Sequence, residues 1–234
     1  MRFEIEKSIF RYFPGMKIIA VVARDIQPLE NTATIDATLA DAWQRAATTL
    51  TEYENPQSHP YIKPWGERMK AVGAPRKQFP SSIEALMRRA GKGNAPASIN
   101  PLVDFYNAIS LKYIVPAGGY DIDAINDDLW LRFSKQGDTF LALDSNEEIN
   151  VPNGEVCYAD GSTIITRHFV WKQSKHAILT HESKNVLFVS EVLEELPPET
   201  ADDVAGAIRT GLKQFFGIDA ETHVLDENMN GIKL

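Results

Sequence analysis

The chain is poor in cysteine, in long apolar runs and in basic charge. Among its 234 residues Cys157 is the only cysteine, which excludes an internal disulfide and fits a reducing compartment. The longest apolar run is the six residues 18–23, far below the roughly 20 that cross a bilayer. The amino terminus carries Glu4 and Glu6 where a signal peptide has an apolar core. We therefore expect a cytoplasmic protein with no membrane segment.

The net charge of −8 argues against nucleic-acid binding over the whole surface, because phosphate contacts need concentrated lysine and arginine. Residues 63–92 are an exception, with eight basic residues and two acidic ones. After Ser190 the balance reverses, with ten acidic residues and three basic ones. A basic patch on an acidic chain is compatible with nucleic acid at one face, and solvated helix faces are the alternative explanation.

The composition is that of a globular protein, with 44% hydrophobic and 24% charged residues. Hydrophobic periodicity and end signals predict helices over residues 34–53, 81–91, 100–113 and 200–216. The Pro-rich residues 55–80 predict an irregular connector with a short helix. Residues 3–23 are predicted to be extended.

From Leu129 onward the sequence changes to short β-rich runs separated by turn residues. These runs predict strands within 129–134, 139–143, 154–159, 162–169, 176–180 and 185–193. Because helices and strands segregate instead of alternating, we expect an α+β fold with a mixed or largely antiparallel sheet and helices packed on one side. No convincing linker interrupts the chain, so one domain over 1–234 is expected.

Several local signals predict helix ends and a turn. Ser81 begins a capping box, and Gly91 suits the left-handed position after that helix. Asn100 is the expected N-cap of the following helix, and Thr200 that of the last one, with which the chain is expected to close. Asp160-Gly161 predicts a two-residue hairpin turn.

The common catalytic motifs are absent, including the Gly-x-Ser-x-Gly elbow, the phosphate loop and the His-Glu-x-x-His zinc helix. The predicted hairpin separates Cys157 from His168 by roughly 13 Å along the strand, which favours a buried structural cysteine. His176 and His181 are predicted to point to opposite faces, and the aspartates of 121–128 lack the pattern of a calcium loop. We expect no metal and no cofactor.

Two stripes share the predicted helix that precedes residue 114. One is apolar and consists of Leu102, Phe105, Tyr106, Ile109 and Tyr113. The other is polar, with Asn100, Asp104 and Asn107 at the same helical steps, and a Pro-x-Gly-Gly-Tyr-Asp turn follows it. Trp171 is the one tryptophan placed where an aromatic ring can line a pocket, although core packing explains it equally well.

The stretch SINPLVDFYNAISLKYIVPAGGYDID resembles the signature of the editing domain, the B3/B4 domain, of the bacterial phenylalanyl-tRNA synthetase beta subunit. That family shows an Ile-x-x-x-Val-Asp-x-x-Asn helix and then a Pro-x-x-x-Phe/Tyr-Asp turn. The matching residues are Ile99, Val103, Asp104, Asn107, Pro116, Tyr120 and Asp121. RRAGKG, GEVCYAD and RHFVWKQ also resemble motifs of stand-alone proteins built on this domain. The resemblance covers roughly residues 70–195.

This resemblance implies binding of tRNA or aminoacyl-tRNA and hydrolysis of the ester of a wrong amino acid, typically tyrosine on phenylalanine tRNA. Because the ester is already activated, no protein nucleophile is required. The expected oxyanion donors are the backbone amides of Gly118 and Gly119. The expected pocket residues are Asp104, Asn107, Tyr120, Arg167 and Trp171. The expected tRNA contacts are Arg76, Lys77, Arg88 and Arg89.

The chain departs from the family at two positions. Gly118 stands where the synthetase has a histidine, and Val189 aligns with the glutamate that reads the tyrosine hydroxyl, with Glu191 two residues further on the same strand face. Loss of a hydroxyl acceptor removes discrimination, so tyrosine specificity is not implied. The departures favour an alternative, a non-catalytic module that binds an amino acid, a small metabolite or RNA. The chain is too short for the synthetase's catalytic domain, so no aminoacylation is expected.

Overall fold

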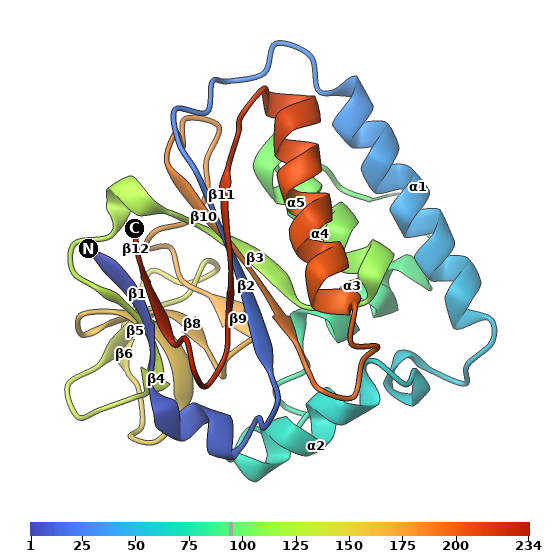
Figure 1. Ribbon diagram of the computed structural model, residues 1–234. Coiled ribbons are helices and arrows are strands. Elements are labelled where there is room, and N and C mark those ends of the chain that lie inside the picture. The colour runs from blue at the N-terminus through green and yellow to red at the C-terminus, as the bar shows by residue number, and fades with distance from the viewer. Residues whose placement is uncertain (94–95) are drawn as a thin grey trace.

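The computed structural model describes residues 1–93 and 96–234. It contains two β-sheets that pack against each other, and helices that cover the outer face of the smaller sheet (Figure 1). The α+β class with mixed, largely antiparallel sheets is confirmed, but the strands form two sheets instead of one.

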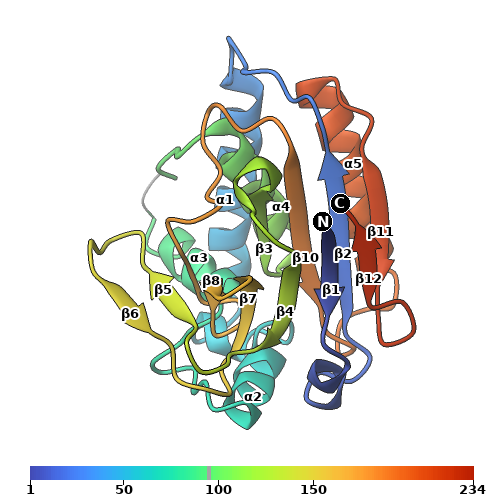
Figure 2. The ribbon, with the colours of Figure 1, turned by 90° about the vertical axis from the view of Figure 1, so that its left-hand side faces the viewer.

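The larger sheet has eight strands, and two of its pairings, β1 with β4 and β5 with β8, are parallel. Its strand order is β12 (Gly231–Lys233), β1 (Arg2–Ile5), β4 (Leu129–Phe133), β7 (Val156–Asp160), β8 (Thr163–Arg167), β5 (Thr139–Leu141) and β6 (Glu148–Asn150), with β9 (Lys172–Gln173) paired to β8. The first and last strands of the chain therefore lie side by side at one edge, where both termini are found (Figure 2).

The smaller sheet has four strands, and every pairing in it is antiparallel. Its order is β11 (Glu221–Leu225), β2 (Lys17–Ala23), β10 (Val186–Val192) and β3 (Ala117–Asp121). The two central strands are buried at almost every position, as continuous apolar runs require. β3 pairs only with β10 and forms one edge of this sheet.

The α-helices of the described residues are α1 (Ala33–Leu50), α2 (Lys63–Ala71), α3 (Ser82–Ala90), α4 (Pro101–Tyr113) and α5 (Thr200–Phe216). α4 and α5 lie on the smaller sheet, and α1 packs on α4 (Figure 1). The Asn100 carboxamide oxygen accepts hydrogen bonds from the N–H groups of Leu102 and Val103, as the predicted cap requires. Ile114 takes the left-handed position after α4, with φ of 55°.

Side chains from both sheets meet in one core. The rings of Tyr120 on β3 and Tyr158 on β7 have centroids 5.4 Å apart, and Tyr158 also lies 6.1 Å from Phe169. On the opposite face of the smaller sheet, Phe188 packs edge-on against Phe105 of α4 at 5.8 Å. The residues of β3 and β10 therefore alternate between the facing sheet and the helices.

The predicted elements need several corrections. Residues 3–23 are not continuously extended, because a 3-10 helix (Lys7–Arg11) and a left-handed Gly15 carry the chain from one sheet to the other. Residues 176–180 form no strand, because Ala177 is left-handed with φ of 54°. The expected turn after α4 is instead strand β3, and the chain closes with β11 and β12 instead of a helix.

Two of the expected helix caps are also wrong. Gly91 has an ordinary helical φ of −64°, and the left-handed residue is Gly93 with φ of 75°. Thr200 is the first residue of α5, so Glu199 occupies the cap position, where its side chain accepts no helix N–H. Gly217 ends α5 in the left-handed conformation. In the part of the chain that the structure describes, no helix is long and apolar enough to span a membrane.

The β7–β8 hairpin turns one residue later than expected. Asp160 pairs with Thr163, so Gly161 and Ser162 form the turn, with Gly161 left-handed at φ of 56°. Because Ser162 does not share the positive φ, glycine at the first central position alone has it, as in a type II′ turn.

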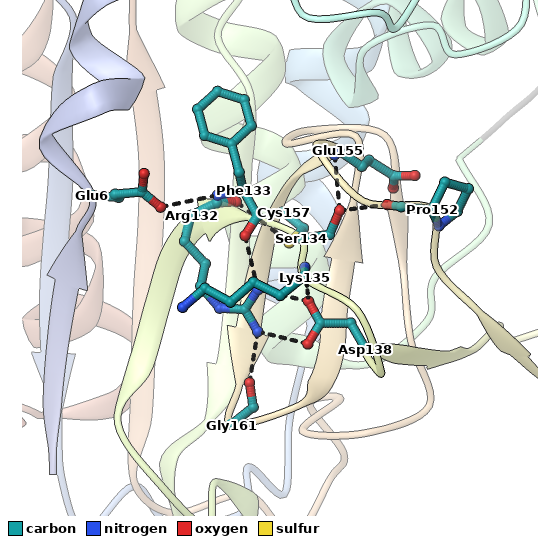
Figure 3. Close-up of polar contacts among 10 residues, drawn as sticks. All are labelled: Glu6, Arg132, Phe133, Ser134, Lys135, Asp138, Pro152, Glu155, Cys157 and Gly161. Carbon is teal, nitrogen blue, oxygen red and sulfur yellow. Dashed lines mark hydrogen bonds and ion pairs between the residues drawn. The ribbon is translucent and has the colours of Figure 1, made fainter.

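Arg132 of β4 forms a buried ion pair with Asp138 and also hydrogen-bonds the turn of this hairpin (Figure 3). Arg132 donates to both carboxylate oxygens of Asp138, at 2.6 and 3.0 Å, and to the carbonyl of Gly161 at 2.7 Å. Cys157 lies beside the pair and donates to the Arg132 carbonyl at 3.4 Å. Burial raises the pKa of the Cys157 thiol to about 12, so it stays protonated and is not a nucleophile at neutral pH.

Candidate functional site

A cavity of about 240 Å³ opens between the two sheets, next to α3 and α4. Of the seven residues expected as oxyanion donors or pocket residues, five line it: Asn107, Gly118, Gly119, Tyr120 and Trp171. They come from α4, from the edge strand β3 and from the turn between β8 and β9. The packing of the sheets thus brings residues of the stretch SINPLVDFYNAISLKYIVPAGGYDID and of the RHFVWKQ segment to one place.

The deep end of the cavity is polar. Glu191 on β10 is 3% exposed, and its carboxylate accepts a 2.5 Å hydrogen bond from the hydroxyl of Tyr158. Next to it, the hydroxyls of Tyr120 and Thr166 are hydrogen-bonded at 2.8 Å. All four residues line the cavity, and each hydrogen bond joins one sheet to the other.

The environment of Glu191 favours its neutral form. Burial raises the pKa of the Glu191 carboxyl from 4.5 to about 7, although the Tyr158 hydrogen bond opposes this shift. Burial also raises the pKa values of Tyr120 and Tyr158 well above 10. Near neutral pH the deep end therefore holds one carboxyl group that exchanges a proton and two neutral phenols.

The backbone of β3 presents one free edge. Asp121 N–H points away from β10 to the carbonyl of Ala177, whereas Ile122 N–H points to β10. Because strand N–H groups alternate, the amide of Gly118 points to β10 and those of Ala117 and Gly119 point to the free edge. The carbonyl of Gly119 lies on the same edge, where the Gln173 side chain donates to it at 3.1 Å.

Because the N–H groups of β3 point alternately to either side, only one of the two expected oxyanion donors is available. The Gly118 amide belongs to the β3–β10 ladder, since Gly118 pairs with Val189. The Gly119 amide remains available, and Ala117 supplies a second amide that sequence reasoning did not single out. Gly118 contributes space instead, because no described residue beyond its chain neighbours has an atom within 4 Å of where its Cβ would be.

Asn107 projects from α4 into the cavity with a free side chain. It is half-buried, and its carboxamide makes no hydrogen bond to any described residue. Ser110, one turn later, also lines the cavity, but its hydroxyl donates to the carbonyl of Val115 at 2.5 Å. Asn107 is therefore the polar group of α4 that remains available to a ligand.

Asp104 does not lie in the cavity, contrary to expectation. Its carboxylate accepts hydrogen bonds from the Ser98 hydroxyl at 2.5 Å and from the Ile99 N–H at 3.1 Å, and the side chain is 1% exposed. One helical turn separates it from Asn107 in sequence, but it faces the segment that leads into α4. Its role is to hold that segment.

Arg167 likewise does not line the cavity. Its guanidinium makes two hydrogen bonds to the buried carboxylate of Glu155, at 2.8 and 2.7 Å. Glu155 also accepts from the N–H of His168, which has a left-handed φ of 44°. Arg167 thus stabilises the strained turn that carries Trp171, and its guanidinium carbon lies 5.8 Å from the Trp171 ring centroid.

The four expected tRNA contacts differ in their surroundings. Arg88 and Arg76 both approach the buried carboxylate of Glu84, at 2.5 and 4.0 Å. Lys77 is exposed and has no ion-pair partner among the described residues. Arg89 is also exposed and unpaired within the described chain, and it lines the cavity. Of the basic segment, Arg89 is the residue that the fold brings to the site.

At the deep end of the cavity, two of the four polar residues are not predicted from the sequence. Tyr158 and Thr166 lie in predicted strands, but nothing in the sequence indicated that β7 and β8 face β10. Glu191 was noted for its alternation with Val189, and both residues line the same wall. The signal that could have found it is therefore the period of two along β10.

No group of three or more His, Cys, Asp or Glu side chains suited to a metal occurs in the described residues. The acidic segment serves local structure instead. Asp121 accepts from the Ser183 hydroxyl at 2.6 Å, and Asp123 accepts from the Asn185 carboxamide. His176 contacts Asp160 through Nε2 at 2.7 Å.

Residues 65–199 match the B3/4 domain family. The chain is 26% identical over 168 residues to the phenylalanine–tRNA ligase beta subunit of Pectobacterium atrosepticum, an alignment that covers 71% of this chain and 20% of that subunit. An N-terminal fragment of the Pyrococcus horikoshii phenylalanyl-tRNA synthetase beta subunit shares the fold, with a TM-score of 0.50 and 9% identity over 96% of this chain and 54% of the fragment. The chain thus spans about a fifth of the length of the ligase subunit.

Proposed function

Because the chain belongs to the B3/4 domain family, we propose that it binds aminoacyl-tRNA and hydrolyses a mischarged aminoacyl ester in trans. One observation carries this proposal: a single cavity combines free strand-edge amides, the free carboxamide of Asn107 and a buried carboxyl group. These are the groups that an ester substrate with a polar side chain requires.

The reaction adds water to the ester carbonyl carbon and breaks the bond between that carbon and the ribose oxygen, which leaves with a proton as the terminal hydroxyl. The carbonyl oxygen gains negative charge in the transition state, and the Gly119 amide on the free edge is placed to donate to it. Asn107 is placed to orient the water or the substrate's amino group. The neighbouring ribose hydroxyl supplies further assistance, so no side-chain nucleophile is needed.

Recognition of the amino acid falls to the deep end of the cavity. Glu191 accepts a hydrogen bond from Tyr158 and retains lone pairs for a donor on the ligand. A side chain that ends in a hydroxyl or an amine would meet this carboxyl group, whereas an apolar one would leave it without that partner. We therefore expect discrimination in favour of a substrate with a donor at its tip.

The experiment is deacylation of a panel of mischarged tRNAs, beginning with tyrosyl-tRNA(Phe), by the purified protein. We expect hydrolysis above the buffer rate for at least one member, and a loss of about tenfold or more in kcat in the Asn107→Ala variant. Asn228→Ala, at an exposed position in the β11–β12 loop, is the matched control and should retain full activity. A flat result across the panel with folded protein would refute hydrolysis.

The second candidate is a non-catalytic module that binds a free amino acid. It is favoured by Gly118, which leaves open space where the family has a histidine. Calorimetric titration with free amino acids and with uncharged tRNA separates the two functions. Editing requires tRNA affinity that falls steeply with salt, whereas a free amino acid binds with little salt dependence.

A further inference from the structure

The open end of the cavity differs from the deep end in both charge and chemistry. Trp171, Arg89 and Lys172 line it and are more exposed than Glu191. Lys172 forms an ion pair with Asp144 at 2.8 Å, but Arg89 has no ion-pair partner among the described residues. The cavity is therefore bipolar, with a carboxyl group inside and a free guanidinium at the opening.

The Trp171 ring is held in place from several sides. Phe79 packs edge-on against it, with centroids 4.8 Å apart and planes at 77°. The imidazole of His168 lies 5.4 Å away, and the Arg167 guanidinium, fixed by Glu155, lies 5.8 Å away. A half-buried indole that is fixed in this way is a pre-organised surface for a second planar group.

We propose that Trp171 and Arg89 form a nucleotide seat at the opening, where the base of the terminal nucleotide stacks on Trp171 and its phosphate contacts Arg89. Stacking on an aromatic side chain accepts any base, and arginine binds phosphate through its planar fork. A negative phosphate is attracted to the Arg89 guanidinium at the open end, whereas the Glu191 end offers a carboxyl group and two neutral phenols. The seat thus orients an aminoacyl nucleotide with its amino acid inward. This inference rests on the proposed function in one respect only, that the bound nucleotide is the terminal nucleotide of a tRNA.

Binding is tested directly, without hydrolysis, by calorimetric titration of the full chain. The probes are adenosine 5′-monophosphate, the 5′-phosphorylated trinucleotide CCA and ribose 5-phosphate, which lacks a base. We expect the trinucleotide to bind best and ribose 5-phosphate to bind at least about tenfold more weakly than the monophosphate. If adenosine 5′-monophosphate and the trinucleotide bind with equal affinity, the seat is supported, but its ligand is a free nucleotide.

The variants separate stacking from charge. Trp171→Ala should weaken nucleotide binding about tenfold, and Trp171→Phe should weaken it less because a ring remains. Arg89→Gln should lower the affinity of all three phosphate probes about fivefold and reduce the salt dependence. The controls are Trp130→Ala, which removes an exposed indole of β4, and Arg209→Gln, which removes an exposed guanidinium of α5.

The outcomes distinguish this seat from the proposed function. Nucleotide binding that depends on Trp171 in a protein with no deacylase activity would support the seat and refute the hydrolysis. Deacylation with an unchanged KM in Trp171→Ala would refute the seat and leave the hydrolysis standing. Binding of adenosine 5′-monophosphate that is indifferent to Trp171, or equal to that of ribose 5-phosphate, would also refute the seat.

Discussion

At the scale of single residues, Gly118 and Gly119 have opposite roles. Neither glycine has a left-handed backbone, so each is needed for space and not for conformation. A Cβ at Gly119 would lie 2.7 Å from Cδ1 of Leu179, whereas a Cβ at Gly118 would meet no atom within 4 Å. Gly119 allows close packing behind β3, and Gly118 leaves room within the cavity.

Alanine substitutions should separate these roles. We expect Gly119→Ala to lower the free energy of unfolding by roughly 1–2 kcal/mol, because buried Leu179 must move. Gly118→Ala should leave it unchanged or raise it by up to about 1 kcal/mol, because alanine restricts the unfolded chain. Urea unfolding measures both, and equal losses for the two variants would contradict this assignment.

At the scale of elements, the N-terminus of α4 links three segments. Asn100 caps the helix with its carboxamide oxygen and donates through its nitrogen to the carbonyl of Leu179 at 3.1 Å. Leu179 in turn packs behind Gly119 of β3. One turn further, Asp104 fastens the incoming segment. The polar stripe therefore anchors the helix at its start, and only Asn107 reaches the cavity.

Removing this anchor should destabilise the protein. We expect Asn100→Ala to lower the free energy of unfolding by roughly 2 kcal/mol, since both the cap and the bond to Leu179 are lost. Asn100→Asp keeps the cap oxygen and should cost less. Thr32→Ala is the control, because the Thr32 side chain accepts no helix N–H at the start of α1. A Thr32→Ala loss as large as that of Asn100→Ala would disprove the capping role.

At the scale of the whole molecule, the floor of the cavity is also the joint between the sheets. Tyr158 of the larger sheet donates to Glu191 of the smaller one, and Tyr120 and Thr166 form a second bond across the gap. The groups that would recognise a substrate therefore also hold the two halves of the fold together. Their protonation affects stability as well as binding.

Two buried groups should give opposing pH dependences of stability. Folded Glu191 keeps its proton up to about pH 7, so stability from this group falls as pH rises from 4.5 to 7, by up to roughly 3 kcal/mol. Burial lowers the pKa of His168 from 6.5 to about 4, so its contribution rises over that range by a similar amount. The two contributions nearly cancel in the native protein.

Single variants should unmask each contribution. In Glu191→Gln, stability should rise between pH 4.5 and 6.5, because only the His168 contribution remains. In His168→Asn, stability should fall as pH rises to 7, and asparagine tolerates the left-handed backbone at this position. Urea unfolding at pH 4.5, 5.5 and 6.5 measures the slopes. Identical slopes for both variants and the native protein would contradict this account.

The sequence by itself determined the local elements and the family resemblance. Asn100 with Pro101 predicts the start of α4, and the β-branched run predicts β2, because caps and periodicity act over a few residues. Alternation also places Val189 and Glu191 on one face of their strand.

Only the tertiary structure decided what those faces meet. Glu191 reaches the cavity because β10 faces β7, Asp104 leaves it because the segment before α4 folds back, and Arg76 approaches buried Glu84 from the loop before α3. Each of these contacts joins residues through a particular docking of sheets, helices or turns. Local sequence specifies which side chains share a face, but the partner of that face depends on long-range packing, which periodicity does not encode.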